Sequence, residues 1–394
     1  MVSLSLTSLF TVCMALAAPL GAIASPAPAS AHAERGMDKR WYPIRPKVMI
    51  ISMFAPEDVW TENLKLDQNI TLPGLSPLFP KVGCNAEGTI CQMTTGESEI
   101  NAAVSVTSAL LASEFDFTKT YFLIAGIAGV NPFTGTLGSV GFARYAVQVA
   151  LAYEIDARQI PSNWTTGYYL FGSDGPGEPA STIYGTEVYE LNTNLRDTII
   201  AYTDGVSLND TEGAAAYRAN YDYAPANQPP AVFKGDVSTS DAYFAGSLLD
   251  EAFGNITSIW TNGTGVYSLT AQEDNASLEA MARAHTAGKM DFARVILMRT
   301  ASDFDRAPPN QDTIFSFQTN QGGFSPAIAN IYVAGLPIVE GIINDWDTVF
   351  GGGIDPQEGW AFNADVFHTF TQRKREMREF ERVVRRSNNV MSRR

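Results

Sequence analysis

The chain has 394 residues, of which 45% are hydrophobic and 18% are charged, and it contains 3 Cys. This composition is typical of a globular protein and excludes a disordered, collagen-like or disulfide-dense chain. The 27 Lys and Arg against 42 Asp and Glu give a formal net charge of -15. A surface of that sign repels phosphate backbones, which argues against nucleic acid as a partner.

The first 24 residues are apolar and uncharged and run into the small-residue sequence AIAS. They predict a signal peptide over residues 1–24, with an uncleaved membrane anchor as the alternative. Residues 25–40 form a Pro- and Ala-rich linker that closes in Lys39-Arg40, which resembles a dibasic processing site. The protein is therefore predicted to be secreted or associated with the cell wall, with its folded domain over residues 41–370.

Two further features agree with a secretory route. Once a signal peptide is removed, Cys84 and Cys91 are the remaining cysteines, and a disulfide between them would suit an oxidising compartment. Acceptor sequences for N-glycosylation occur at Asn69, Asn163, Asn209, Asn255, Asn262 and Asn275. His285 and His368 are far apart and lack the paired spacing of metal ligands, so neither a metal nor a cofactor is predicted.

From residue 46 onward the pattern alternates between strands and helices. Short β-branched or aromatic runs predict strands at 47–53, 90–94, 121–125, 232–235, near 267–271 and at 293–306, where the strand ends in a polar cluster. Apolar residues at helical spacing predict helices at 56–66, 98–113 and 186–201. Two more helices are predicted in the second half of 236–253 and in the second half of 267–285.

Other segments complete this order. Residues 139–156 have the character of a long strand or hairpin, and residues 162–181 form a Gly-, Pro- and Ser-rich loop. No run after residue 24 approaches the ~18 to 20 apolar residues of a membrane-crossing helix. The order predicts a doubly wound α/β domain, a three-layer α/β/α sandwich with a central mixed sheet.

Residues 371–394 carry 9 basic and 3 acidic residues and have helical character, in contrast to the acidic chain before them. A basic tail of this kind more often packs against an acidic body, or is solvated, than binds a separate partner.

Ligands of parallel α/β sheets bind beyond the carboxyl ends of the strands. Polar or Gly-rich clusters follow predicted strands at 126–129, 236–243, 273–275 and 299–303. The sequence GIAG lacks the remainder of a dinucleotide or Walker motif, so it predicts a tight turn. Because the chain has neither a GxSxG elbow nor a Cys free to pair with His, carboxylates, hydroxyls and aromatic rings remain. That set suits a neutral, polyhydroxylated, aromatic ligand.

Six ordered segments carry a family resemblance: KVMIISMFAPEDVW, MTTGESEINAAVS, YFLIAGIAGVNPFTGTLGSV, GDVSTSDAYFAG, QEDNASLEAM and LMRTASDFDR. Between about residues 46 and 353, the chain resembles the fungal purine nucleoside permease family. That family looks like a branch of the nucleoside phosphorylase and nucleosidase superfamily. The resemblance implies a nucleoside phosphorylase-like α/β/α domain with a site for a purine nucleoside.

The resemblance also implies roles for individual residues. Asp303 would face N7 of the purine as a general acid, and Glu273, or Asp274 in a shifted alignment, would hold the ribose hydroxyls. Tyr243 would stack on the base, and Glu57 would activate water in a hydrolytic reaction. Because cleavage of an N-glycosidic bond builds positive charge on the sugar, a carboxylate near the ribose would also stabilise the transition state.

Residues in or beside the same motifs complete the predicted substrate-binding set, namely Asp241, Arg299, Ser302 and Gly126. Phosphorolytic relatives hold phosphate with Arg and Ser in the Gly-rich loop, whereas this chain has Ile124 and Ile127 there. Since aliphatic side chains cannot pair with a dianion, phosphorolysis is disfavoured.

The resulting prediction is a purine nucleoside permease-like protein that binds adenosine- or guanosine-type nucleosides and supports their uptake as a secreted binding protein. The alternatives are an extracellular purine nucleosidase and a non-catalytic surface or storage glycoprotein. Each carboxylate also has an ordinary structural alternative, as a helix cap or a salt-bridge partner. A homo-oligomer and an unidentified membrane transporter are open as partners.

Overall fold

The structure is a computed structural model that describes residues 42–363. The predicted signal peptide, the linker with Lys39-Arg40, His368 and the basic tail at 371–394 lie outside the described residues.

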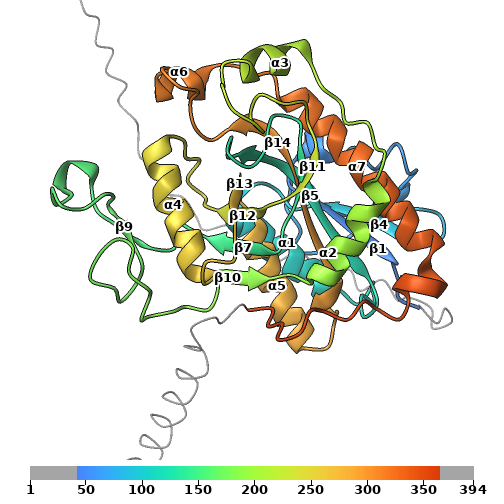
Figure 1. The fold of residues 1–394 in the computed structure, drawn as a ribbon. Coiled ribbons are helices and arrows are strands. Elements are labelled where there is room, and N and C mark those ends of the chain that lie inside the picture. Colours follow the sequence, from blue (N-terminus) through green and yellow to red (C-terminus); the bar gives the residue numbers. More distant parts are fainter. Residues whose placement is uncertain (1–41, 364–394) are drawn as a thin grey trace, which may run out of the picture. The chain divides into compact units, whose positions relative to one another are not determined.

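A 12-stranded mixed sheet organises residues 42–363 (Figure 1). Its main path runs β10-β7-β12-β13-β5-β1-β4-β3-β2, with β14, β6 and β11 joined beside β5. The strands are β1 (Val48–Ser52), β2 (Gln68–Thr71), β3 (Lys81–Cys84), β4 (Ile90–Thr94), β5 (Tyr121–Val130), β6 (Val140–Phe142), β7 (Tyr145–Gln148), β10 (Val188–Glu190), β11 (Val232–Lys234), β12 (Asp236–Thr239), β13 (Tyr267–Ala271) and β14 (Val295–Phe304). A separate pair consists of β8 (Tyr153–Glu154) and β9 (Tyr168–Tyr169).

The centre of the sheet is parallel. β1 pairs in parallel with β4 and β5, and β5 pairs in parallel with β14. β13 is antiparallel to β5 but parallel to β12. The predicted strands at 47–53, 90–94, 121–125, 232–235 and near 267–271 are confirmed, as is the strand within 293–306, which forms β14 up to Phe304. The mixed character of the sheet is confirmed as well.

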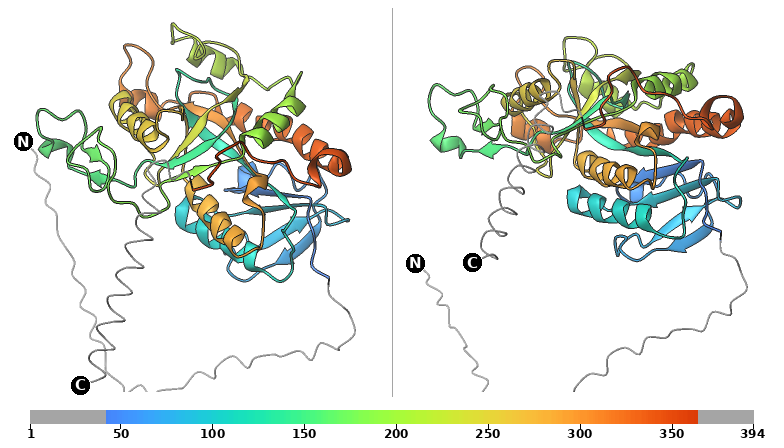
Figure 2. Two further views of the ribbon diagram at one scale, coloured as in Figure 1. Left: turned by 60° about the horizontal axis from the view of Figure 1, so that its bottom comes forward. Right: turned by 90° about the horizontal axis from the view of Figure 1, so that it is seen from below.

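Helices cover both faces of this sheet (Figure 2). They are α1 (Ser98–Leu111), α2 (Thr193–Ile200), α3 (Glu212–Arg218), α4 (Ser247–Trp260), α5 (Asp274–Thr286), α6 (Thr313–Gln318) and α7 (Phe324–Asn344). Because side chains alternate along a strand, Val48 and Ile50 of β1 pack with α2 and α7, whereas Met49 and Ile51 pack with α1 and α5. The three-layer α/β/α prediction is confirmed.

The predicted helix at 56–66 is wrong. The chain forms a single 3-10 turn at Ala55–Glu57 and then irregular turns. Glu57 is buried, and its carboxylate accepts hydrogen bonds from the backbone N–H groups of Met53 and Ile127. Local apolar spacing cannot reveal this, because one of the two donors lies on a strand 70 residues away.

The predicted tight turn at 126–129 is also wrong, because these residues continue β5 and pair with β14. Their glycines serve close packing. A Cβ at Gly126 would lie 2.0 Å from Met53 Cε and 2.5 Å from Glu57 Oε1, and a Cβ at Gly129 would lie 2.3 Å from Thr270 Oγ1. The glycine signal therefore marks the approach of other side chains to the strand.

Three further predictions need correction. The predicted helix at 186–201 divides into β10 and α2, because the Asn192 side chain caps the helix by accepting from Leu195 N–H. The predicted strand or hairpin at 139–156 forms β6, β7 and β8, which pair with other strands and not with one another. In the predicted turn at 236–243, the first four residues form β12.

The sequence did not predict α7, and the expectation that no apolar run after residue 24 approaches the length of a membrane-crossing helix is wrong. Among residues 42–363, α7 is the one helix whose length and composition would let it cross a membrane. However, 56% of its most apolar window is buried, and Ile331, Ile338 and Ile342 pack against β1, β5 and β14. We interpret α7 as a core helix, because a buried core helix can have the same length and apolar composition as a membrane-crossing one.

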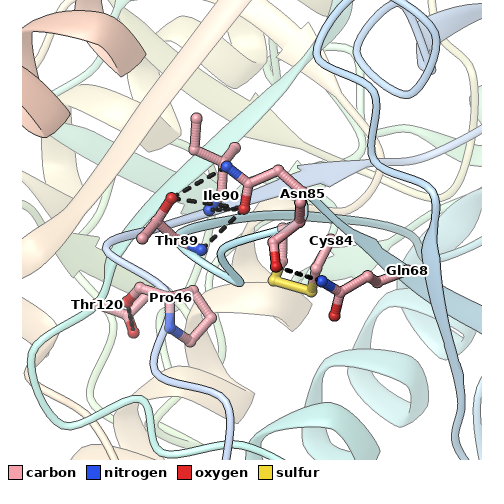
Figure 3. Close-up of a disulfide and its surroundings, with 9 residues drawn as sticks. Pro46, Gln68, Cys84, Asn85, Thr89, Ile90 and Thr120 are labelled. Atoms are coloured by element: carbon pink, nitrogen blue, oxygen red, sulfur yellow. Dashed lines mark hydrogen bonds between the residues drawn. A yellow bond between two sulfur atoms is a disulfide. The ribbon is translucent and has the colours of Figure 1, made fainter.

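The predicted disulfide is confirmed (Figure 3). Cys84 and Cys91 lie directly opposite each other on antiparallel β3 and β4. Asn85 closes the intervening turn, since its Oδ1 accepts from Thr89 N and Ile90 N at 2.8 and 3.1 Å. Of the six N-glycosylation acceptors, Asn275 is buried and donates to the Thr186 carbonyl, whereas the other five are exposed. Asn275 is thus inaccessible in the folded chain.

Candidate functional site

A cavity of about 440 Å³ lies where β5, β13 and β14 meet. This volume falls in the range of small-molecule sites, roughly 300–1,000 Å³. Six of the predicted site residues line it: Glu57, Tyr243, Glu273, Arg299, Ser302 and Asp303. Predicted residues from four segments, 57, 243, 273 and 299–303, therefore come together at one cavity.

Arg299 on β14 organises one wall of the cavity. It is 2% exposed, and its Nη2 donates to Glu273 Oε2 at 3.0 Å. Nε and Nη2 also donate to the two carboxylate oxygens of Asp274, and Nη1 donates to the Ile127 carbonyl at 2.9 Å. A buried guanidinium with several carboxylate partners is held in a fixed orientation.

Glu273 and Asp274 have different positions despite being neighbours. Glu273 lines the cavity, and its second oxygen accepts from Ser98 N–H at 3.0 Å. Asp274 is fully buried in the first turn of α5, away from the cavity wall, where it pairs with Arg299. Of the two alternatives for the ribose carboxylate, the structure places Glu273 at the cavity.

Glu57 is a buried carboxylate of the cavity wall, close enough to Arg299 to feel its charge. Its Oε2 and Oε1 accept from Met53 N and Ile127 N at 2.7 and 2.8 Å. Burial raises the pKa of Glu57 from its usual 4.5 to about 7, although the Arg299 charge and the two backbone donors oppose this effect. Glu57 can therefore exchange a proton near neutral pH, as a general base does.

Asp303, near the end of β14, carries another carboxyl of the cavity. Ser302 Oγ donates to its Oδ1 at 2.5 Å, and Tyr243 OH donates to its Oδ2 at 2.8 Å. Burial raises the pKa of Asp303, while these two donors lower it. The Tyr243 ring is 60% exposed and meets Phe317 edge-on at 5.6 Å, so an aromatic pair stands at the mouth beside this carboxyl.

Besides Asp274, two predicted binding residues do not reach the cavity. Asp241 is exposed, and its Oδ1 accepts from Ser98 Oγ and Glu99 N at the start of α1, which makes it a helix cap. Gly126 lies behind the wall, beside Glu57 and Arg299. Both residues were predicted because they belong to the clusters 126–129 and 236–243, which follow predicted strands in the sequence. Position in the sequence did not show which way their side chains or backbone face.

The sequence did not predict the aromatic and amide residues that 317–324 and Phe54 contribute to the cavity. Phe317, Asn320, Gln321 and Phe324 line the cavity. Gln321 is fixed there because its Oε1 accepts from Phe304 N at 2.7 Å. This segment begins 13 residues beyond the end of β14, so the rule that led to Asp303, which looks directly at strand ends, does not reach it.

The two isoleucines that were predicted to stand at phosphate-binding positions differ in their surroundings. Ile124 is buried in the core, and Ile127 lines the cavity. No group of three or more His, Cys, Asp or Glu within residues 42–363 has the arrangement of a metal site.

A second group of buried charges begins two residues beyond Asp303. Tyr267 OH donates to Asp305 Oδ2 at 2.8 Å and lies 3.3 Å from Asp250 Oδ1, while Arg306 Nε lies 3.3 Å from Asp250 Oδ2. We call these four residues the buried acid cluster. Burial and the charge of Asp305 raise the pKa of Asp250. The cluster fixes the start of α4, directly after the loop that carries Tyr243.

A family model and the curated relatives of this chain point to one protein family. Residues 45–355 match the family described as purine nucleoside permease (NUP). A purine nucleoside permease of Candida albicans is 42% identical over 86% of this chain and 84% of its own length. The chain belongs to the purine nucleoside permease family. A second relative, a probable purine nucleoside permease of Schizosaccharomyces pombe, is 41% identical over 80% of this chain and 94% of its own length.

Solved structures with some similarity to this permease-family chain include two nucleosidases. A 5′-methylthioadenosine/S-adenosylhomocysteine nucleosidase from Colwellia psychrerythraea, in complex with adenine, has a TM-score of 0.45 and 14% identity over 77% of this chain and 97% of its own. The corresponding enzyme from Neisseria meningitidis has a TM-score of 0.42 and 16% identity over 75% and 99%.

Proposed function

We propose that the cavity binds a purine nucleoside. The observation that carries the proposal is the convergence of an aromatic pair, a carboxyl with a raised pKa and a charged carboxylate–guanidinium wall on one cavity. Two relatives that are 41–42% identical are named as a purine nucleoside permease and a probable purine nucleoside permease. A purine nucleoside offers a flat aromatic base, ring nitrogens and sugar hydroxyls, which these groups complement.

Each part of the cavity then has a role. Tyr243 and Phe317 provide ring faces and edges for the base, and a protonated Asp303 donates a hydrogen bond to a purine nitrogen such as N7. Glu273 and Arg299 present an acceptor and a donor to the ribose hydroxyls.

Hydrolysis of the N-glycosidic bond is the second candidate function, and the pKa of Glu57 favours it. A carboxyl that titrates near pH 7 on the cavity wall is suited to activate a water molecule. Asp303 would protonate the departing base, and Glu273 would stabilise positive charge on the sugar. The water oxygen bonds to C1′, the C1′–N9 bond breaks, and free base and ribose are the products.

We propose that the protein acts outside the cell membrane, secreted or held in the cell wall, and supports uptake by capturing nucleosides there. The disulfide between Cys84 and Cys91 supports an oxidising compartment, and five exposed N-glycosylation acceptors are compatible with it. Membrane passage itself would then depend on a separate transporter.

Calorimetry and chromatography on the same purified chain test both candidates. Binding of adenosine or guanosine without release of base supports a binding protein, and release of adenine or guanine supports a nucleosidase. Asp303→Asn removes the acid and is expected to weaken binding or turnover at least tenfold, whereas the exposed control Asp67→Asn has no effect. If the wild-type chain neither binds a nucleoside nor releases a base, the proposal is refuted.

A further inference from the structure

A groove outside the nucleoside cavity runs between α1 and α5, which lie side by side (Figure 2). It has a volume of about 320 Å³. α1 contributes Glu99, Ile100, Ala103 and Thr107 to its walls, and α5 contributes Ala276, Glu279, Ala280 and Arg283. These residues recur every three or four positions, so each helix presents one continuous face. The alanines between the larger side chains leave room for a further helix to approach.

An exposed apolar stripe extends one wall of this groove. Ile100, Val104 and Leu111 are 77%, 53% and 58% exposed, and together with Thr107 they follow helical spacing along α1. Scattered apolar side chains on a surface need no explanation, but a stripe beside a groove is typical of a docking face.

Negative charge collects at the end of the groove where α1 begins. Glu97 precedes α1 and Glu99 lies in its first turn, and Asp241 lies beside them because its Oδ1 accepts from Ser98 Oγ and Glu99 N. Within residues 42–363, none of the three acids has a Lys or Arg partner within 4 Å. Burial and the nearby Asp241 charge raise the pKa of Glu99, which is consistent with an uncompensated negative field.

The described chain ends at the opposite end of the same groove. Phe362 packs on His285, near the carboxyl end of α5, with ring centroids 5.3 Å apart, and its carbonyl accepts from Glu190 N. Figure 1 shows the last described residues passing beside α5 and β10. Since Ser98 at the start of α1 bonds Glu273 just before α5, both helices begin at the acidic end.

We propose that residues 371–386 of this chain occupy the groove as an amphipathic helix antiparallel to α1 and α5. In this segment Met377, Phe380 and Val384 follow helical spacing and form the apolar face. A 16-residue helix is about 24 Å long and the 14-residue α1 is about 21 Å long, so the lengths match.

Charge fixes the direction of this helix. A segment that enters at the carboxyl end of α5 carries Arg385 and Arg386 to the acidic end, beside Glu97 and Glu99. The intervening seven residues, 364–370, can span up to about 25 Å when extended, which leaves ample reach. Because Glu97 also lines the nucleoside cavity, the basic end of the helix lies at the rim of that cavity.

Covalent footprinting of side chains tests this inference in the full-length chain. Labelling of Val104 and Leu111 is measured in the wild type, in Phe380→Asp and in the matched control Val390→Asp, which lies beyond the proposed helix. The inference predicts that Phe380→Asp raises labelling of both residues at least threefold and that Val390→Asp leaves it unchanged. Leu78, which is 81% exposed and lies outside the groove, serves as the internal reference.

Dilution separates the tail from other occupants of the groove. An intramolecular helix protects Val104 equally at 50 and at 0.5 µM protein. Protection that is lost on dilution indicates a second copy, and protection that requires anionic lipid vesicles indicates a membrane surface. Either result, or equal labelling in wild type and Phe380→Asp, overturns the inference.

Discussion

Replacing Glu57 by Gln isolates the effect of one buried carboxyl on stability. The pKa of Glu57 is raised from 4.5 to about 7, so between these pH values the folded chain keeps a proton that the unfolded chain releases. Stability from this group is therefore fully present below pH 4.5 and is lost as pH rises through 7. At about 1.4 kcal/mol per pH unit, the difference between 4.5 and about 7 amounts to a loss of about 3.5 kcal/mol.

Glutamine has nearly the same shape as glutamate, but its side chain does not ionise. Because its amide nitrogen cannot accept a hydrogen bond, either Met53 N–H or Ile127 N–H loses its partner in the variant. That loss costs about 1–3 kcal/mol at every pH. The variant is thus expected to be less stable than wild type at pH 4.5, with the difference shrinking or reversing by pH 8.

Denaturant unfolding of the two chains between pH 4 and 8 measures this difference directly. Other titrating groups are common to both chains and cancel. Glu62→Gln, at an exposed position in the next turn, is the matched control and should leave the pH profile of wild type unchanged. A wild-type minus Glu57→Gln difference that stays constant over this range would refute the reasoning.

Three further predictions concern other parts of the chain. Tyr243→Ala should weaken nucleoside binding about tenfold in calorimetry, since base stacking contributes about 1–3 kcal/mol, whereas Tyr243→Phe should cost less than about threefold; equal losses would contradict stacking. Asp250→Asn mimics the protonated acid, so wild type should lose stability relative to it as pH rises from 5 to 9 in denaturant unfolding; parallel profiles would exclude the raised pKa. Cys84→Ser with Cys91→Ser should lower the free energy of unfolding by about 2–3 kcal/mol, because the closed loop is short; no change would show that the disulfide adds nothing.

The success of the strand predictions and the failure at 56–66 have related physical causes. Strands β1, β4 and β14 are buried on both faces, so short apolar runs marked them in the sequence. Residues 56–66 have apolar spacing as well, but the Glu57 side chain turns inward to bonds with Met53 and Ile127. Helical periodicity describes only local contacts and cannot anticipate a partner on another strand.

The candidate site divides in the same way. Asp303 and Ser302 could be predicted because they lie near the end of a parallel strand, where ligands of such sheets bind. Asp241 satisfied the same rule but caps α1 instead, because Ser98 and Glu99 offer it backbone and hydroxyl donors. Phe317 and Gln321 were missed because they lie 13 and 17 residues beyond the end of β14, within and after the short helix α6, and return to the strand end only in the folded chain.

The sequence by itself determined the α/β class, the central strands, the disulfide between Cys84 and Cys91 and the resemblance to a permease family, since each follows from local composition or ordered motifs. Only the tertiary structure decided that Glu273 faces the cavity while Asp274 turns away to Arg299. Neighbouring residues at a helix start point in different directions, and the direction matters only once other elements surround them. The raised pKa of Glu57 likewise arises from burial among segments distant in sequence, which no local pattern encodes.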